Sequence, residues 1–527
     1  MSVLSASNNN RKIQSKEVAV GNMVIGGNHP VLIQSMTNTK TLDTDATVDQ
    51  IVRLADVGCE MVRITTQNIK EAQNLNEIKN TLIKKGYRLP LIADVHFNPK
   101  VAEIAAQIVE KVRINPGNYV DGNNLKIDFT EEEYHSELVK IEQKLSPLID
   151  ICKKNSTAIR IGTNHGSLSN RILAKYGNTT EGMVESAIEF VQICKNLNFE
   201  HLVLSMKASN VRIMIEANKL LVERMTKNGY YYPVHLGVTE AGDGADARIK
   251  SAAGIGNLLM NGIGDTIRVS LTEIPENEIP VARQLVGLYG KKKDKPPIIN
   301  AEEIIIKNNN QLIKSSNLKP PYVISQGSSE IADFSLDQKN ILHRNEGVIE
   351  TETISVLSDS AGDFEIGILK LNYSDLEKEK LLVKAASEFS YLYDLHPSIG
   401  ICITNKSTSP DTNTQLALDI LQAMGLRFSK TEFIACPSCG RTKFDIQDHL
   451  KRVKEKTAHL KGIRIAIMGC IVNGPGEMAD SDYGYVGSGT GKVNLYKGST
   501  LMYTNLNENV AVDTLISLIK DGEDWKD

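Results

Sequence analysis

Three cysteines near the end of the sequence have the spacing of a metal or cluster site. Cys436 and Cys439 form a Cys-Pro-Ser-Cys pair, and Cys470 follows in the segment Met468-Gly-Cys-Ile-Val-Asn-Gly-Pro-Gly-Glu477. Thiolates are soft ligands that suit zinc or an iron–sulfur cluster. The pattern therefore predicts a metal centre built on three cysteines, and Cys-x-x-Cys occurs with both kinds of metal.

The fourth ligand separates two interpretations of this centre. In a structural zinc ribbon, His449 or His459 would complete the coordination. In a four-iron cluster, the nearest carboxylate of the same turn-rich loop, Glu477, would be a weak oxygen ligand. One iron would then be exchangeable and could act as a Lewis acid and electron donor. The spacing alone favours neither interpretation.

An earlier part of the sequence predicts the scaffold. From about residue 31 to 290, short apolar runs alternate with segments whose apolar residues recur at helical spacing. Eight such units are typical of an α/β fold of the (β/α)8 TIM-barrel type, whereas a doubly wound sheet rarely needs so many. The predicted strands are Val31–Met36, Glu60–Ile64, Leu91–Val95, Lys111–Ile114, Ala158–Ile161, His201–Ser205, Val234–Val238 and Thr266–Ser270.

The ends of these predicted strands are rich in cations. In a TIM barrel the ligand site lies at the face where the strands end, so these side chains should converge. Burying unpaired cations together would be prohibitive, which implies an anionic ligand, and guanidinium forks match the oxygens of a diphosphate. For each arginine alone, pairing with a neighbouring acid is the simpler interpretation. The strand-end residues are Arg63, Asp94 with His96, Arg113, Arg160 with Asn164, Lys207, Glu240 and Arg268.

Glu240 is the lone carboxylate at the end of the seventh predicted strand. Its pKa should fall among the cations, unless burial and ligand charge raise it. It could orient a substrate hydroxyl or relay a proton. Asp94 is another candidate, and His96 and His165 rank below Glu240 because a lone histidine is more often structural.

Composition restricts the remaining possibilities. The 527 residues carry a formal charge of −4, and the lysine-rich run 291–297 lacks aromatic residues, so it is interpreted as a linker and not as a nucleic-acid patch. No apolar run approaches the roughly 18 residues of a membrane span. The odd count of seven cysteines indicates a reducing compartment. The polar first ten residues resemble no secretory signal, so we expect a cytoplasmic protein.

The sequence divides into three predicted domains. Residues 15–290 form the barrel, 291–411 an inserted α/β module without a chemical motif, and 412–527 a C-terminal α/β domain that holds the cysteines. Within the barrel, the fourth unit is extended by a helix predicted over Glu131–Leu145 and ended by Pro147.

Several long segments resemble one known family. With the cationic barrel and the Cys-x-x-Cys…Cys…Glu pattern, they resemble the 4-hydroxy-3-methylbut-2-en-1-yl diphosphate synthases (GcpE family) of the non-mevalonate isoprenoid pathway, in the three-domain form with an insert. The resemblance spans nearly all of the chain outside residues 291–410. The matching segments are Met61–Thr65, Ile92–Phe97, Lys111–Asn118, Ile159–Leu168, Leu204–Ser209, His235–Gly242, Gly262–Ser270 and Met468–Glu477.

This resemblance implies a specific chemistry. It implies a [4Fe–4S] cluster on Cys436, Cys439, Cys470 and Glu477, with Glu240 and Glu477 in catalysis. The reaction would be the two-electron reductive ring opening and dehydration of 2-C-methyl-D-erythritol 2,4-cyclodiphosphate, with ferredoxin or flavodoxin as donor and a homodimer as the assembly. The implied substrate contacts are Arg63, Asp94, His96, Arg113, Arg160, Asn164, Lys207, Arg268, Ser270 and Asn473.

Two other classes compete with this interpretation. One is a non-redox barrel transferase of the pterin-binding kind that carries a zinc ribbon. The other is a diphosphate-binding regulatory protein without catalytic activity. The identity of the metal separates the first from the resemblance, and turnover separates the second.

Overall fold

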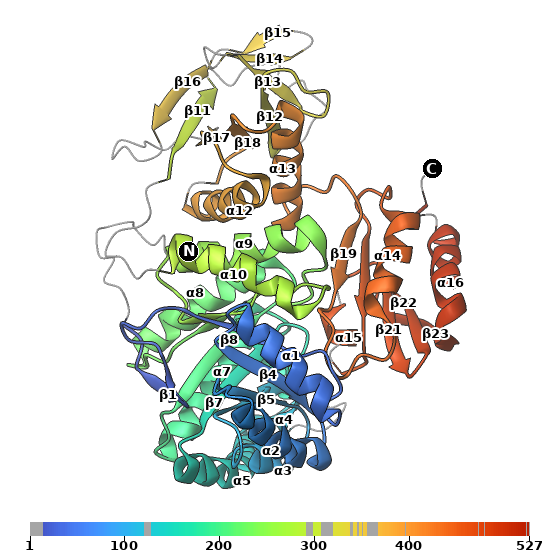
Figure 1. The fold of residues 1–527 in the computed structure, drawn as a ribbon. Helices are drawn as coiled ribbons and strands as arrows, with labels where there is room; N and C mark the ends of the chain where they lie inside the picture. Colours follow the sequence, from blue (N-terminus) through green and yellow to red (C-terminus); the bar gives the residue numbers. More distant parts are fainter. Residues whose placement is uncertain are drawn as a thin grey trace.

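Eight parallel strands close into a barrel in the first part of the chain, which confirms the predicted TIM barrel (Figure 1). They pair in the order β8-β7-β6-β5-β4-β3-β10-β9, and a parallel bridge between Leu204 and Val234 joins the two ends of this order. The strands are β3 (Leu32–Met36), β4 (Met61–Thr66), β5 (Leu91–Val95), β6 (Lys111–Ile114), β7 (Ala158–Asn164), β8 (Leu202–Lys207), β9 (His235–Leu236) and β10 (Thr266–Ile267).

The computed structural model describes most of the chain. The described residues are 14–120, 128–290, 299–306, 320–337, 341–344, 347–349, 351–355, 367–395, 397–472, 474–478, 480–522 and 524–525. Within these ranges, no helix is both long enough and apolar enough to span a membrane.

An N-terminal hairpin covers the end of the barrel at which the strands begin. Its strands are β1 (Val18–Val20) and β2 (Met23–Ile25), which pair antiparallel. Their buried side chains form one apolar cluster with Leu32, Met61, Ile92, Ala158 and Val203 from the barrel strands. A ligand therefore has to enter from the opposite face, where the strands end.

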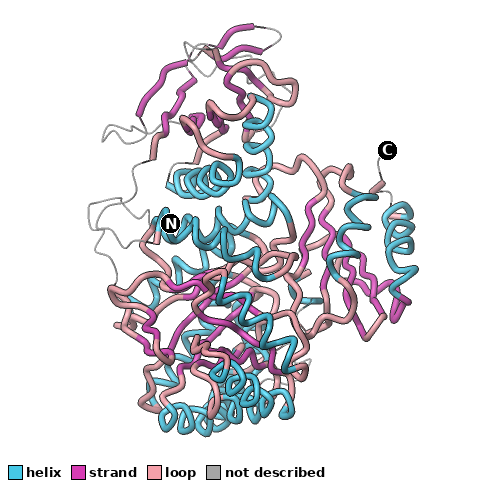
Figure 2. Tube along the Cα trace, viewed as in Figure 1, coloured by secondary structure: helices cyan, strands magenta, loops and turns pink. Residues whose placement is uncertain are grey.

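Helices surround the barrel, as Figure 2 shows. One differs from its prediction: α5 does not end before Pro147 but continues through it to Asn155. Pro147 is exposed, and Leu148 and Ile149 extend the buried stripe beyond it, so packing outweighs the lost hydrogen bond. The helices are α1 (Thr44–Asp56), α2 (Ile69–Lys84), α3 (Pro99–Ala105), α4 (Pro116–Tyr119), α5 (Glu131–Asn155), α6 (Asn170–Tyr176), α7 (Thr180–Asn196), α8 (Val211–Lys227), α9 (Gly244–Met260), η1 (Pro275–Asn277) and α10 (Glu278–Tyr289).

The inserted residues form a mixed sheet that rests on the barrel through a helix (Figure 1). Helix α12 (Lys378–Leu395) packs against α9, where the Asn257 side chain donates to the carbonyl of Ser390 (2.9 Å). Gly256 permits this approach, because a Cβ there would lie 2.1 Å from the Ser387 hydroxyl. The strands are β11 (Ala301–Ile306), β12 (Tyr322–Gln326), β13 (Phe334–Leu336), β14 (Leu342–Arg344), β15 (Gly347–Ile349), β16 (Thr351–Ser355), β17 (Gly367–Tyr373) and β18 (Gly400–Asn405).

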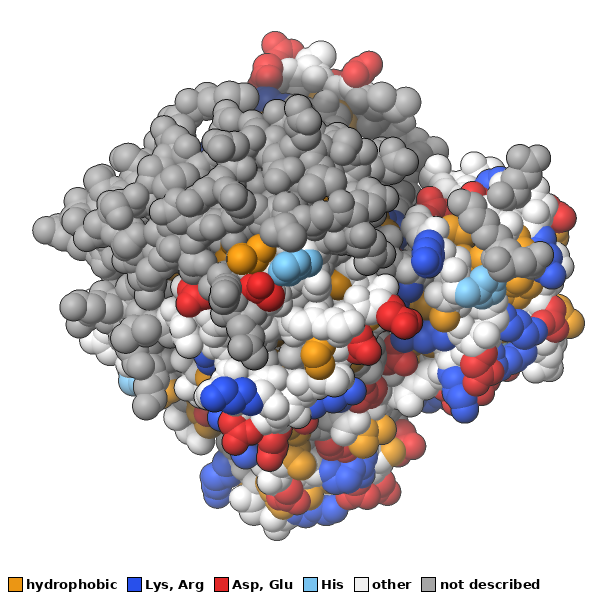
Figure 3. Space-filling view, turned by 90° about the horizontal axis from the view of Figure 1, so that it is seen from above, with side chains coloured by type: hydrophobic (Ala, Val, Ile, Leu, Met, Phe, Trp, Pro, Cys, Tyr) orange, Lys and Arg blue, Asp and Glu red, His pale blue; other side chains and the backbone are white. Residues whose placement is uncertain are grey.

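The C-terminal domain is a five-stranded sheet that forms a separate lobe beside the barrel (Figure 1). Acidic and basic side chains are intermingled on the lobe face visible in Figure 3. The glycine-rich run 487–492 contains the turn of an antiparallel hairpin. The elements are β19 (Glu432–Ala435), α14 (Ile446–Thr457), β20 (Arg464–Met468), α15 (Gly474–Glu477), β21 (Tyr483–Gly489), β22 (Lys492–Lys497), β23 (Thr500–Asn507) and α16 (Glu508–Asp521).

Helix α13 (Pro410–Ala423) connects the insert to this lobe. The predicted boundary at residue 411 gives most of it to the C-terminal domain, yet the helix packs against β12 and β18 of the insert and against α9. We therefore propose that the insert includes α13 and that the C-terminal domain starts after it.

Candidate active site

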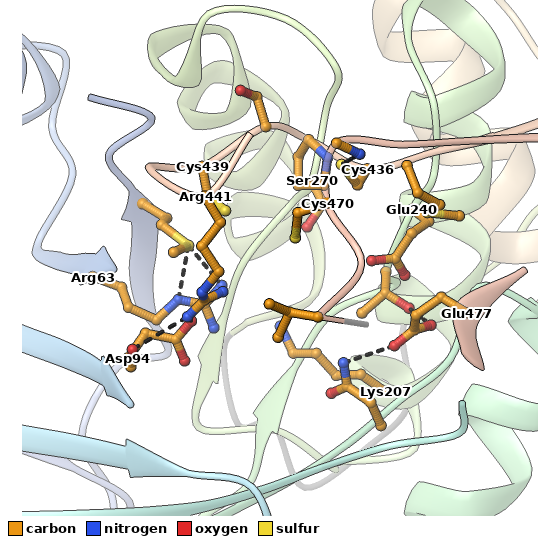
Figure 4. A pocket seen from close by; sticks show the side chains of 18 of the residues that line it. Arg63, Asp94, Lys207, Glu240, Ser270, Cys436, Cys439, Arg441, Cys470 and Glu477 are labelled. Atoms are coloured by element: carbon orange, nitrogen blue, oxygen red, sulfur yellow. Dashed lines mark hydrogen bonds and ion pairs between the residues drawn. The ribbon is translucent and has the colours of Figure 1, made fainter. Parts of the chain in front are cut away.

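The barrel mouth and the cysteine loops of the C-terminal domain line one cavity of about 100 Å³ (Figure 4). From the barrel, the lining includes Arg63, Asp94, His96, Arg113, Arg160, Asn164, Lys207, Glu240, Arg268 and Ser270, and from the C-terminal domain Cys436, Cys439, Arg441, Cys470 and Glu477. Asn473 lies outside the described residues. His165 contacts the backbone oxygen of Asn178 (3.1 Å) and is not part of this lining.

Parallel strands bring the cations together. Strands β4 to β8 end side by side, and each carries a polar side chain at or near its last residues. The loops after β9 and β10 add Glu240 and Arg268. Consequently, residues that are far apart in the sequence face one space, as the strand-end argument predicts.

Two of the cations are neutralised by carboxylates. Arg113 donates to Asp94 (3.1 Å) and to the Gly162 carbonyl (2.8 Å). Arg268 makes a two-point pair with Glu278, with distances of 3.1 and 2.9 Å. Glu278, the first residue of α10, is 1% exposed, and the sequence analysis did not identify it. The pairing interpretation therefore holds for Arg268.

Other cations have few partners. Arg63 directs its Nε and Nη2 at the Met36 sulfur (3.1 and 2.9 Å), a weak acceptor. Burial and the guanidinium groups of Arg160 and Arg63 hold the pKa of Lys207 well below its usual value. The Nε–H groups of Arg113, Arg160 and Arg441 are buried without a hydrogen-bond partner among the described residues. Buried donors of this kind are costly, and an acceptor-rich anion is the kind of ligand that would satisfy them.

His96 is a neutral member of the mouth. Burial, followed by the charge of Arg441, lowers its pKa from 6.5 to about 3. Arg113 is always a donor, so His96 Nε2 accepts its hydrogen bond (2.7 Å) and the ring proton lies on Nδ1. The Asn118 amide lies 3.1 Å from Nδ1, and a proton on Nδ1 requires this amide to turn its oxygen toward the ring and accept. His96 therefore orients Arg113 and does not act as an acid near neutral pH.

Glu240 and Glu477 form a buried carboxylate pair between the two domains. They hydrogen-bond to each other, and Glu477 also accepts from Asn164 (2.8 Å) and Thr239 (3.3 Å). Burial and the facing Glu477 raise the pKa of Glu240 well above its usual value, so burial outweighs the neighbouring cations. Two carboxylates in contact cannot both be ionised, and the pair therefore holds a proton.

The backbone at Glu240 is unusual. Its φ is +49°, in the left-handed region that non-glycine residues rarely adopt, and Ser438 between the two cysteines has a φ of +64°. Strain of this kind is concentrated at functional sites. The Glu240 carbonyl also accepts a hydrogen bond from the Ala435 N–H (3.2 Å), one residue before Cys436.

The three cysteines line the cavity from two loops, one after β19 and one after β20. The Gly469 N–H donates to the Cys436 sulfur (3.2 Å), and hydrogen bonds to cysteine sulfurs are one of the features that tune iron–sulfur clusters. Among the described residues, no three His, Cys, Asp or Glu side chains are grouped to hold a single ion. Three cysteines on the wall of one cavity are a donor set that iron–sulfur clusters use.

The histidines of the zinc interpretation have other partners. His449 Nδ1 contacts the Tyr485 hydroxyl (2.5 Å), and its ring lies between Phe444 and Tyr485. His459 packs edge-on against Trp525. Neither belongs to the cavity lining, so the structure does not support a zinc ribbon completed by either histidine.

The C-terminal domain is seated on its own barrel by main-chain contacts. Gly242 N–H donates to the Ala435 carbonyl (3.2 Å), and Ala241 and Ala435 form a parallel bridge. Gly166 and Gly476 approach so closely that a Cβ on Gly166 would lie 2.2 Å from the Gly476 carbonyl carbon. A single chain therefore supplies both walls of the cavity.

Arg441 is the main site residue that sequence reasoning missed. It follows Cys439-Gly440 directly, and its Nη2 donates to Asp94 Oδ2 (3.0 Å). Its position next to the cysteine pair was the available signal. Its partner could not be read from the sequence, because Asp94 lies 347 positions away.

The fold and cavity define a class: TIM-barrel proteins whose cationic mouth is covered by a cysteine-bearing α/β domain. Comparison with known proteins identifies a family within this class. The model of the GcpE TIM-barrel domain matches residues 15–283, and that of the GcpE protein C-terminal domain matches residues 432–521.

Relatives named 4-hydroxy-3-methylbut-2-en-1-yl diphosphate synthase (flavodoxin) align with nearly the whole chain. The protein of Phocaeicola vulgatus is 42% identical over 97% of this chain and 98% of its own length. That of Bacteroides thetaiotaomicron is 42% identical (96% and 97%), and that of Leptospira interrogans 38% (98% and 97%). The chain thus belongs to the 4-hydroxy-3-methylbut-2-en-1-yl diphosphate synthase family of oxidoreductases.

Proposed function

We propose that this chain reduces 2-C-methyl-D-erythritol 2,4-cyclodiphosphate to 4-hydroxy-3-methylbut-2-en-1-yl diphosphate. One observation carries the proposal: the arginine-rich mouth of the barrel and three cysteine thiols line the same cavity. The balanced reaction takes up two electrons and two protons, breaks the ring C–O bond and releases water. Family membership supports the same substrate.

The residues fit a [4Fe–4S] cluster on Cys436, Cys439 and Cys470, with Glu477 as the oxygen ligand. Such a cluster, when bound, would supply electrons and a Lewis-acidic iron next to the substrate. In the structure the carboxylate of Glu477 is bonded to Asn164 and Thr239 of the barrel. An ionised carboxylate has about four acceptor sites, so Glu477 would serve as the oxygen ligand while these barrel contacts orient its side chain.

The barrel side chains hold the diphosphate in this proposal. Arg63, Arg113, Arg160 and Lys207 supply the positive charge, and their excess over nearby acids stabilises the anion. Arg268 contributes less, because Glu278 already occupies two of its donors. Asp94, His96 and Asn164 orient these cations, and Ser270 offers a hydroxyl at the cavity wall.

Glu240 is the proton donor of the proposed reaction. It is 8% exposed and protonated by its environment, and its Oε2 has no hydrogen-bond partner among the described residues. A neutral carboxyl group in this position can give a proton to the oxygen that leaves as water. The C-terminal domain covers part of the barrel mouth and would limit the access of bulk water to the reduced substrate.

Flavodoxin is the donor that we propose, after the names of the relatives, with ferredoxin as the alternative. We also propose a cytoplasmic location. A homodimer stays part of the proposal, but it is not needed to complete the site, because one chain provides both walls.

The test is anaerobic purification followed by iron, sulfide and zinc analysis and a visible spectrum. We expect about four irons per chain, a brown colour that bleaches with dithionite, and turnover of the cyclodiphosphate with reduced flavodoxin. Stoichiometric zinc in colourless protein would instead support the transferase. Glu240→Gln should keep ligand binding and abolish turnover; unchanged turnover would remove Glu240 from the mechanism.

A further inference from the structure

Arg441 brings a cation of the C-terminal domain into the mouth of the barrel. It is 6% exposed and lines the cavity, and its Nη2 donates to Asp94 through both the side chain (3.0 Å) and the carbonyl (3.3 Å). Figure 4 shows its side chain extending from the cysteine loop toward Arg63 and Asp94. Asp94 therefore accepts from one arginine of each domain, Arg113 and Arg441.

The Nε–H of Arg441 has no hydrogen-bond partner in the described part of the chain. Arg113 and Arg160, on the barrel side of the same cavity, share this feature. If Arg441 only linked the two domains, it would need no buried N–H donor without a hydrogen-bond partner. An anion in this cavity would therefore meet arginines of both domains, each with one donor that has no partner in the described part of the chain.

We propose that Arg441 is a further substrate-binding residue, which donates to the diphosphate from the C-terminal domain while Asp94 holds it in place. This inference rests on the proposed function, because the anion is the diphosphate of that substrate. Full affinity for the anion then requires the C-terminal domain to be seated on the barrel. Binding of the diphosphate and closure of the cavity consequently favour each other.

The proposal is tested by calorimetric titration of the anaerobic holoenzyme with inorganic diphosphate. Loss of a charge-assisted hydrogen bond in Arg441→Gln should weaken binding by about tenfold or more. Arg441→Lys keeps the charge without the fork and should lie between parent and Arg441→Gln. Lys454→Gln is the matched control, since it removes another interdomain ion pair, with Asp243, that lies outside the cavity lining, and its affinity should stay within about twofold of the parent.

Asp94→Asn distinguishes a direct contact between Arg441 and the anion from a role of Arg441 in linking the two domains only. If Arg441 acts only through Asp94, Arg441→Gln and Asp94→Asn weaken diphosphate binding equally. If Arg441 contacts the anion, Arg441→Gln weakens binding more than Asp94→Asn does, because Asp94→Asn keeps the Arg441 guanidinium in the cavity and removes a competing negative charge. Iron and sulfide content and the visible spectrum must match the parent in each variant.

Two results would overturn the inference. Parent-like affinity of Arg441→Gln would show that Arg441 does not contact the anion. Equal weakening in Asp94→Asn would show that Arg441 only links the two domains. The proposed function would remain valid after either result. A parent holoenzyme that fails to bind diphosphate would instead count against the proposed function itself.

Discussion

Gly166→Ala perturbs the contact between the two domains without changing a barrel strand or a cysteine. Gly166 has no positive φ, so alanine is compatible with its backbone, and the nearest atoms to an added Cβ all belong to Gly476 and Glu477. The methyl group would lie 2.2 Å from the Gly476 carbonyl carbon, whereas real Cβ contacts essentially never fall under 3.0 Å. The two loops must therefore separate by about 0.8 Å, the difference between these distances.

A displacement near 1 Å at a reacting centre can lower the rate by about a hundredfold. We expect Gly166→Ala to lose turnover of the cyclodiphosphate on that scale, with parent-like cluster content and melting temperature. Gly287→Ala is the control, because its added Cβ meets no atom within 4 Å. Turnover of Gly166→Ala within twofold of the Gly287→Ala control would refute the claim that this close contact positions the active site.

Three further predictions concern stability. The folded-state pKa of His96, about 3, lies below its unfolded value of 6.5, so its contribution is complete above pH 6.5 and falls with pH toward 3. Between pH 7.5 and 5 the parent should lose about 2 kcal/mol more than His96→Gln in urea unfolding; parallel losses would contradict this. Glu278→Gln leaves the Arg268 guanidinium buried without its counter-ion, and urea unfolding should show a loss of about 3–5 kcal/mol; a loss below 1 kcal/mol would contradict the pairing. Pro147→Ala restores a helical donor at an exposed position of α5 and should raise stability by about 1–3 kcal/mol in thermal unfolding; an unchanged or lower stability would contradict this.

Sequence periodicity predicted the barrel because its strands are buried on both faces and its helices on one. Each unit thus leaves a local signal, and all eight predicted strands are present. The strand-end rule then placed the predicted barrel cations around one cavity. Local sequence signals did not predict the features that depend on tertiary packing. Helix α5 continues past Pro147, and α13 packs on the insert although it precedes the cysteine domain.

The pairing of charges could not be predicted from sequence. Arg268 follows a strand and Glu278 begins a helix, and no sequence motif connects them. Only the fold shows that they form an ion pair. For the pKa of Glu240, the sequence analysis considered two opposite effects, lowering by neighbouring cations and raising by burial. The sequence does not show how deeply Glu240 is buried, so it could not decide between them. The structure shows nearly complete burial against a second carboxylate, so the pKa rises.

Glu240 connects the two halves of the site through both backbone and side chain. Its carbonyl accepts from Ala435 next to Cys436, and its carboxyl group bonds to Glu477. Its left-handed φ turns the chain so that both contacts are made at once. A shift of the C-terminal domain would therefore move the proposed proton donor and the cysteines together. While the two domains are in contact, this shared attachment keeps the distance between Glu240 and the cysteines fixed. The proposed reaction requires such a fixed distance, because it needs a proton and electrons at the same carbon–oxygen bond.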